Sequence, residues 1–246
     1  MTKAVLCDLD DTLFDHSGAT RDALAHVRTL STDLGRWTLD DLDRHHRIVL
    51  EELHTEVLAG QWTIEDARIE RFRRLMRQSG ACDDDCTPDV LHELSWGYRR
   101  EYETAWRLVP GAMALVEAIK RSGAHLVIVT NNVVREQRLK LDRGGLAPFV
   151  DVLVTSEEFG ATKPDPRIIW HALERVNGAP EHAVMFGDSL TTDIEGARRA
   201  GVRAVWFNRT GARSNDPALA EVSSLEDPQT LGRILGSRME PRGFER

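Results

Sequence analysis

Several features are scarce or missing in this sequence of 246 residues, and each excludes a class of protein. It contains no run of 18 or more apolar residues, and Met1 leads directly into a short apolar segment and an acidic turn. We therefore expect neither a membrane span nor a signal peptide. Basic residues are in the minority, at 32 Lys and Arg against 40 Asp and Glu, and the net charge of -8 argues against a nucleic-acid partner. This charge is compatible with a small anionic ligand held by a metal ion.

Cysteine and lysine are also scarce. Of the three cysteines, Cys82 and Cys86 form a C-x3-C pair without a second pair of ligands, which favours an exposed loop over a zinc site. So few cysteines are typical of a reducing compartment, and we expect a cytoplasmic protein. Arginine carries most of the positive charge, because lysine occurs only at positions 3, 120, 140 and 163. Nothing in the composition indicates an oligomeric state.

Short apolar runs, continuous and rich in β-branched residues, are typical of buried parallel strands. They lie at residues 4–7, 125–130, 150–155, 183–186 and 203–207. Helical patterns that close on glycine separate the later runs, at residues 111–123, 134–145, 165–178 and 192–202. This alternation predicts βαβ units and an α/β fold with a doubly wound, Rossmann-like parallel sheet.

The segment after the first strand breaks this rhythm. It has no strand-like run and instead shows successive helical patterns, two of them opened by Thr38 and Thr63 caps and a third with Pro88 in its first turn. The pattern predicts an all-helical cap domain inserted into the α/β core. We assign residues 1–15 and 107–235 to the core, residues 16–106 to the cap, and residues 236–246 to a loose tail.

Polar side chains follow several of the predicted strands at the point where each ends. They are Asp8, Asp10 and Asp11 after the first strand, Thr130 and Asn131 after the next, and Asp188 and Asp193 in "GDSLTTD". Ligands bind at the carboxyl ends of the strands in such sheets, so we expect these groups to share one crevice. Carboxylates this close repel one another unless a hard cation lies among them, and an all-oxygen set of ligands suits Mg2+.

Lys163 stands apart from the other lysines. Lys120 and Lys140 fall on predicted helices, where a solvated face is the expected position. Lys163 instead lies in a loop between Thr162 and Pro164, where a compact ammonium serves as a point charge that a broad guanidinium would not imitate.

The motifs "DLDDT", "TNN", "KPDP" and "GDSLTTD", in this order and spacing, resemble those of the haloacid dehalogenase-like (HAD) superfamily. The helical insert resembles the α-helical cap of its subfamily I, and the likeness extends to about residue 209. The family often has glycine after the asparagine of the second motif, whereas this chain has Asn132. Asparagine tolerates unusual backbone angles, so we treat the departure as minor.

The resemblance implies a Mg2+-dependent phosphatase that acts on a small phosphorylated metabolite. Asp8 would be the nucleophile that forms an aspartyl phosphate, and Asp10 the general acid and base. The carboxylates of Asp8 and Asp188 and the backbone carbonyl of Asp10 would hold Mg2+, with Asp193 bound directly or through water. Thr130 and Asn131 would bind the phosphate oxygens, and Lys163 would offset the negative charge of Asp8 and the phosphate.

Other functions compete with this interpretation. A haloacid dehalogenase needs neither a metal nor the second aspartate of the first motif, yet both Asp10 and the later acids are present. A phosphonatase would need a cap lysine for a Schiff base, and none occurs between Lys3 and Lys120. A receiver-like regulatory module would also use a strand-end aspartate, a threonine, a lysine and Mg2+. It has no use for a helical cap or for Asp10.

The cap pattern has a softer likeness to the pyrimidine 5'-nucleotidase and N-acylneuraminate-9-phosphatase branch. A nucleoside 5'-monophosphate is therefore the first expected substrate, and a sugar phosphate is the alternative. Candidate substrate contacts are His16, Arg68, Arg71 and Phe72. The spacing of the last three also fits a helix face against neighbouring acids. We expect Trp62 and Trp96 to be packing residues, and the pair at positions 45 and 46 to lie on a solvated helix face.

Overall fold

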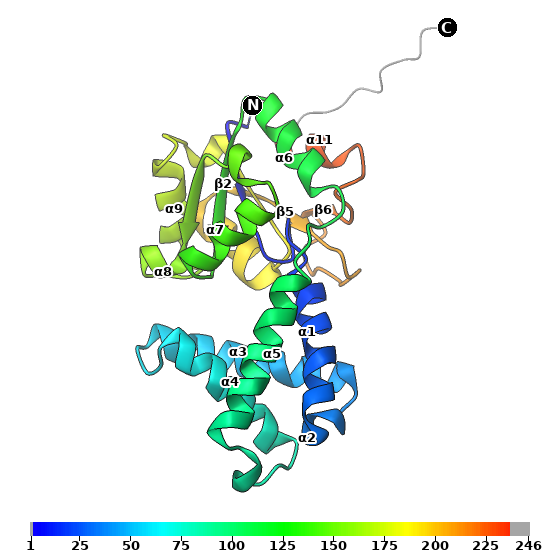
Figure 1. The fold of residues 1–246 in the computed structure, drawn as a ribbon. Coiled ribbons are helices and arrows are strands. Elements are labelled where there is room, and N and C mark those ends of the chain that lie inside the picture. The colour runs from blue at the N-terminus through cyan, green and yellow to red at the C-terminus, as the bar shows by residue number, and fades with distance from the viewer. Residues whose placement is uncertain (1, 237–246) are drawn as a thin grey trace, which may run out of the picture. The chain divides into compact units, whose positions relative to one another are not determined.

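The computed structural model describes residues 2–236, apart from the side chain of residue 58. All of the predicted tail beyond Gly236 lies outside these residues. Within the described residues, the chain divides into two compact units (Figure 1): residues 2–15 and 107–236 form an α/β unit, and His16–Trp106 form a helical unit. No helix within residues 2–236 has the length and apolar character needed to cross a membrane.

The α/β unit contains a six-stranded parallel sheet in the order β3-β2-β1-β4-β5-β6. The strands are β1 (Ala4–Cys7), β2 (His125–Thr130), β3 (Val152–Thr155), β4 (Ala183–Gly187), β5 (Arg203–Phe207) and β6 (Ala220–Val222). The predicted α/β class and parallel sheet are confirmed, and β6 is an addition at the edge. β1 lies between β2 and β4 and is completely buried. A strand with neighbours on both sides and covered faces must be apolar throughout, as "AVLC" is.

Helices connect the strands of the α/β unit. They are α6 (Ala112–Arg121), α7 (Val134–Arg143), α8 (Ser156–Phe159), α9 (Pro166–Glu174), α10 (Glu195–Ala200) and α11 (Thr230–Leu235), with short turns at Ala147–Phe149 and Pro180–His182 and a π-helical turn at Leu190–Ile194. Strand order reverses beside β1, because β2 and β3 continue to one side of it and β4 and β5 to the other. Such a reversal opens a crevice at the carboxyl ends of the flanking strands.

The helical unit consists of α1 (His16–Leu30), α2 (Thr32–Gly35), α3 (Leu39–Leu58), α4 (Ile64–Gln78) and α5 (Pro88–Thr104), with a 3-10 turn at Asp83–Asp85. The predicted helix starts are confirmed. The hydroxyls of Thr38, Thr63 and Thr87 each accept a hydrogen bond from the first turn that follows, and Pro88 occupies the first helical position. These caps fix where the helices begin.

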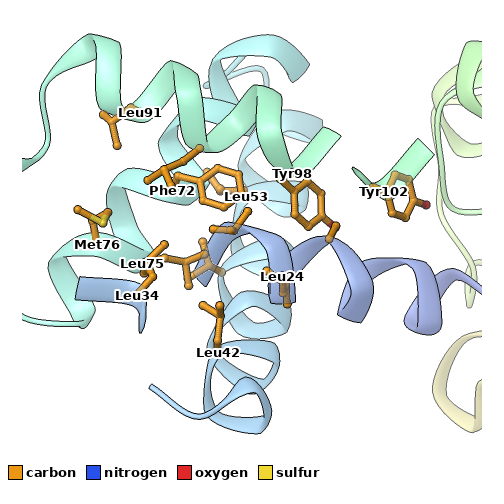
Figure 2. Close-up of a cluster of buried hydrophobic side chains, with 14 of the residues drawn as sticks. Leu24, Leu34, Leu42, Leu53, Phe72, Leu75, Met76, Leu91, Tyr98 and Tyr102 are labelled. Atoms are coloured by element: carbon orange, nitrogen blue, oxygen red, sulfur yellow. The ribbon is translucent and has the colours of Figure 1, made fainter. Parts of the chain in front are cut away.

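Apolar faces of these helices meet in one core (Figure 2). Phe72 and Leu75 of α4 are fully buried there with Leu24 of α1 and Leu42 of α3. The ring of Phe72 lies 5.6 Å from that of Tyr98 on α5. The helical unit therefore buries a core of its own, separate from that of the sheet.

A short paired stem lies where the α/β unit is interrupted. The backbone N–H of Asp15 donates to the carbonyl of Arg107 at 3.0 Å, and that of Val109 donates to Leu13 at 2.9 Å. Asp15 also forms ion pairs with the side chains of Arg107 and Arg209, at 2.8 and 3.1 Å. The two segments at which the chain leaves the α/β unit and returns to it are thus hydrogen-bonded to each other.

Three side chains of the helical unit differ from expectation. Cys86 is buried, His46 is only 1% exposed, and Trp96 is 73% exposed. The prediction for His46 was wrong because α3 turns this residue toward α4, where it accepts a hydrogen bond from Arg71. Trp96 was expected to pack because of its size, yet it lies on the outward side of α5, whose Leu94 and Tyr98 face the core.

We expect Phe72→Ala to lower the free energy of unfolding by about 3–5 kcal/mol, because it leaves a cavity in the core of the helical unit. Trp96→Ala is the matched control, and it should change stability by no more than about 0.5 kcal/mol because its ring is in solvent. Urea denaturation measures both. A small effect at Phe72 would contradict its place in the core.

Candidate active site

The carboxyl ends of β1 and β4 bring three acids together. Asp8 follows β1, and its backbone N–H extends the sheet by donating to the carbonyl of Phe186 at 2.9 Å. Asp188 follows β4, and Asp193 lies in the π-helical turn after it. One carboxylate oxygen from each of these three residues lies within 4.8 Å of the others. The predicted convergence of Asp8, Asp188 and Asp193 is thus present in the structure.

The ammonium group of Lys163 is buried against two of these acids. Its Nζ lies 2.5 Å from Oδ1 of Asp8 and 2.7 Å from Oδ1 of Asp193, and it also donates to the carbonyl of Val129 at 2.7 Å. Burial by itself lowers the pKa of Lys163, but the attraction of Asp193 and Asp8 outweighs it and raises the pKa above the ordinary value. Lys163 therefore stays charged and neutralises part of the acid cluster.

The absence of a side chain at Gly187 allows the carboxylate of Asp193 to lie close against the end of β4. A side chain at this position would collide with the carboxylate of Asp193, so the end of β4 requires glycine. Asp193 is buried, and its Oδ2 accepts a hydrogen bond from the backbone N–H of Ser189 at 3.0 Å. Asp188 is oriented from another direction, since its Oδ1 accepts from the hydroxyl of Thr12 at 3.2 Å.

The acids outnumber the charge that balances them. Burial raises the pKa of Asp8 well above its ordinary range, Lys163 opposes the shift, and repulsion from Asp193 and Asp188 adds to it. Burial and the repulsion of Asp193 and Asp11 raise the pKa of Asp188 to about 7. A hard divalent cation would relieve this repulsion, and carboxylate oxygens are the donors that it prefers. The donor set therefore fits a metal ion.

Thr130 and Asn131 follow β2, the strand on the other side of β1. Thr130 is 2% exposed. The side chain of Asn131 is tied to the main chain of Lys163: its Nδ2 donates to the carbonyl at 2.9 Å, and its Oδ1 accepts from the N–H at 2.7 Å. Asn131 thus positions the loop that carries Lys163.

Asp10 is surrounded by side chains that sequence reasoning missed. Its carboxylate accepts hydrogen bonds from Lys140 at 2.6 Å, Gln137 at 2.9 Å and Asn132 at 3.1 Å. The prediction that Lys140 lies on a solvated helix face was wrong, because Lys140 is completely buried. The rarity of lysine in this chain was a signal that could have drawn attention to it. Asn132 lacks the left-handed backbone that we used to explain it, and its side chain contacts Asp10 instead.

The predicted substrate residues lie in the helical unit. His16 begins α1, and its Nδ1 is 2.7 Å from the hydroxyl of Tyr102. Arg68 is partly exposed and lies 3.8 Å from Glu65, whereas Arg71 is only 8% exposed.

Two neighbours hold Arg71 in place. Its guanidinium lies 4.8 Å from the ring centroid of Tyr98, and it donates a hydrogen bond to His46 at 3.2 Å. Burial and the nearby charge of Arg71 lower the pKa of His46 well below its ordinary value, so His46 is neutral and can accept that bond. Phe72 is fully buried beside Arg71 and forms part of the core.

Comparison with known proteins identifies the family. The model of the haloacid dehalogenase-like hydrolases matches residues 2–201. The HAD-hydrolase YfnB of Bacillus subtilis is 30% identical over 95% of both chains, and its magnesium-bound crystal structure superposes with a TM-score of 0.74 over 96% of this chain and 99% of that one. The pyrimidine 5'-nucleotidase YjjG of Escherichia coli is 40% identical over 83% of this chain and 85% of its own. The N-acylneuraminate-9-phosphatase of Rattus norvegicus is 28% identical over 94% of each.

The chain therefore belongs to the haloacid dehalogenase-like hydrolase family. Within this family it is a phosphomonoester hydrolase, and the resemblance to the HAD superfamily that the four motifs indicated is confirmed.

The shifted pKa of Asp188 predicts how stability depends on pH in the absence of metal. The pKa is about 7 in the folded protein against an ordinary value of 3.8, so the folded state binds more protons between these values and loses stability as the pH rises. In EDTA, the stability of the wild type relative to Asp188→Asn should therefore fall between about pH 4 and pH 7 and level off above that range. Comparison with the Asn variant removes the opposite contribution of groups that both proteins share, such as the buried His46. Urea denaturation at several pH values measures the difference, and a constant difference would contradict the raised pKa that burial and the neighbouring acids give Asp188.

Proposed function

We propose that this protein is a Mg2+-dependent phosphatase that hydrolyses a small phosphorylated metabolite through an aspartyl phosphate on Asp8. The observation that carries the proposal is the buried Asp8 carboxylate, held by Lys163 beside Asp188 and Asp193. This arrangement combines a nucleophile, a fixed positive charge and an oxygen-lined cation site. Phosphoryl transfer needs little more from a protein than such positioning and charge stabilisation.

In the first step, an oxygen of Asp8 attacks phosphorus, and the ester bond between phosphorus and the leaving oxygen breaks. Asp10 gives a proton to that oxygen, so an alcohol departs. In the second step, water attacks the phosphorus of the aspartyl phosphate while Asp10 takes its proton. Inorganic phosphate leaves, and the carboxylate of Asp8 is restored.

The remaining residues of the site bind the phosphate oxygens and Mg2+ and neutralise negative charge. Lys163 offsets the charge that Asp8 and the phosphate bring together. We assign phosphate oxygens to the Thr130 hydroxyl and to the main-chain N–H of Asn131, because the Asn131 side chain already holds the lysine loop. The carboxylates of Asp8 and Asp188 and the backbone carbonyl of Asp10 would hold Mg2+, with Asp193 supporting them. Bound there, Mg2+ would neutralise charge that develops on the phosphoryl oxygens.

The proposed substrate is a nucleoside 5'-monophosphate, and a sugar phosphate is the alternative. The similarity to a pyrimidine 5'-nucleotidase at 40% identity supports the first, and the N-acylneuraminate-9-phosphatase supports the second. We propose that His16, Arg68 and Arg71 contact the leaving group. Phe72 would act indirectly, because its ring packs beside the guanidinium of Arg71.

Phosphate release from an aryl phosphate should require Mg2+, because the acids at the site repel one another without a cation. Excess EDTA should abolish turnover, and added Mg2+ should restore it. Ca2+ should inhibit, since its larger and looser coordination shell disturbs the geometry that octahedral Mg2+ imposes. Full turnover in EDTA would exclude the metal assignment.

Substitution separates the roles of the two motif-one acids. Asp8→Asn should give neither turnover nor acid-stable phosphate on the precipitated protein, because an amide does not attack phosphorus. Asp10→Asn should retain Mg2+ binding, since its metal ligand is the backbone carbonyl, while kcat falls by about 10^2 to 10^4. Isothermal titration with Mg2+ and steady-state kinetics measure the two effects. A normal kcat in Asp10→Asn would refute its assignment as acid and base.

The helical unit should decide substrate preference, because the core treats every phosphate ester alike. Pyrimidine nucleoside 5'-monophosphates should show a higher kcat/KM than sugar phosphates. Arg71→Ala should lower that kcat/KM while sparing acetyl phosphate, which has no large leaving group. Arg44→Ala, which removes an exposed ion pair with Asp41 in the same unit, is the control. Equal losses on both substrates would show that Arg71 only stabilises the helical unit.

A further inference from the structure

Both oxygens of the Asp10 carboxylate are held by side chains of the segment that follows β2. Lys140 Nζ lies 2.6 Å from Oδ1, while Gln137 Nε2 and Asn132 Nδ2 donate to Oδ2 at 2.9 and 3.1 Å. A carboxylate that accepts from two directions cannot rotate about its last bond without breaking hydrogen bonds. Asp10 is therefore fixed in orientation as well as in position.

The burial of Lys140 needs an explanation, because an ammonium group loses its hydration when it is buried. Lys140 has no exposed surface, and its Nζ contacts Asp10 and, at 3.2 Å, Glu136 one turn earlier on α7. It also lies 5.1 Å from the ring centroid of Phe14. A lysine that served only solubility would point into solvent. The burial of Lys140 is explained better by its contact with the carboxylate of Asp10.

Local structure holds the three donors rigidly. Gln137 and Lys140 are three residues apart on α7 and so lie on one face of the helix. The helix starts immediately after the second motif, where Glu157 accepts a hydrogen bond from the N–H of Val134 at 2.8 Å. Asn132 is anchored at its own oxygen, which accepts from the N–H of Val133 at 2.8 Å, so that its amide nitrogen is directed at Asp10.

We propose that Asn132, Gln137 and Lys140 form a clamp that orients Asp10 for proton transfer. They are positioning residues, because they act through Asp10 and not on the substrate. The inference rests on the proposed function of Asp10 as acid and base. It adds Gln137 and Lys140, which lie outside the four motifs, and gives a role to Asn132 at the end of the second motif. Proton transfer requires the donor and acceptor to be aligned, and a displacement of about 1 Å can cost on the order of 10^2 in rate.

A double-mutant cycle tests the clamp. Lys140→Met keeps the length of the side chain and removes its charge, and we expect kcat to fall by about 10-fold to 100-fold with KM within about twofold. In the Asp10→Asn background, the same substitution should have little further effect, because the group that it positions is gone. Lys120→Met is the control: Lys120 forms an exposed ion pair with Asp151 in the same unit and should leave kcat unchanged.

Gln137→Met and Asn132→Gly test the same clamp with smaller disturbance, in case Lys140→Met unfolds the protein, and each should show the same non-additivity with Asp10→Asn. Thermal unfolding in Mg2+ verifies that each variant is folded. If Asp10→Asn is slow while the folded clamp variants turn over at the wild-type rate, the clamp is wrong and the proposed function survives. Losses that multiply in the double variants would also overturn the clamp, because they would act independently of Asp10. A normal kcat in Asp10→Asn itself would instead overturn the proposed function.

Discussion

The buried ammonium of Lys163 is the charge on which the cluster of Asp8, Asp188 and Asp193 depends. It lies between Asp8 and Asp193, where two carboxylates would otherwise face each other in a poorly solvated site. Asn131 holds the lysine loop by two hydrogen bonds, and Gly187 leaves room for Asp193. These features serve one electrostatic requirement, which is to place a positive charge against the buried carboxylates of Asp8 and Asp193.

The second requirement is that the polar side chains of the site come together, and the parallel sheet meets it. Asp8 and Asp188 leave adjacent strands at the point where the strand order reverses, and Thr130 leaves the strand on the other side. Residues separated by more than a hundred positions in the chain therefore meet without any long loop. The rigid parallel strands hold these groups more firmly than surface loops could.

The sequence predicted the fold class and the convergence of Asp8, Asp188 and Asp193 because strand-end residues of a parallel sheet share one edge, whatever their neighbours do. It could not predict Lys140, because a helical pattern does not reveal which charged residue faces an internal carboxylate. His46 was missed because the helical pattern does not reveal which polar residue of α3 faces Arg71 of α4, and Trp96 because size alone does not decide burial. The strand β6 has three residues and one of them is Glu221, so it offers too little pattern to be recognised.

The hydrogen-bonded stem at Asp15 and Arg107 gives the insert the character of an enlarged hairpin loop. Because the two ends of the helical unit leave from paired backbone positions, a core bearing a tight turn there would keep every strand neighbour that it has now. The boundary between the two units therefore lies at a hydrogen-bonded backbone pair and not within any of the six strands of the sheet.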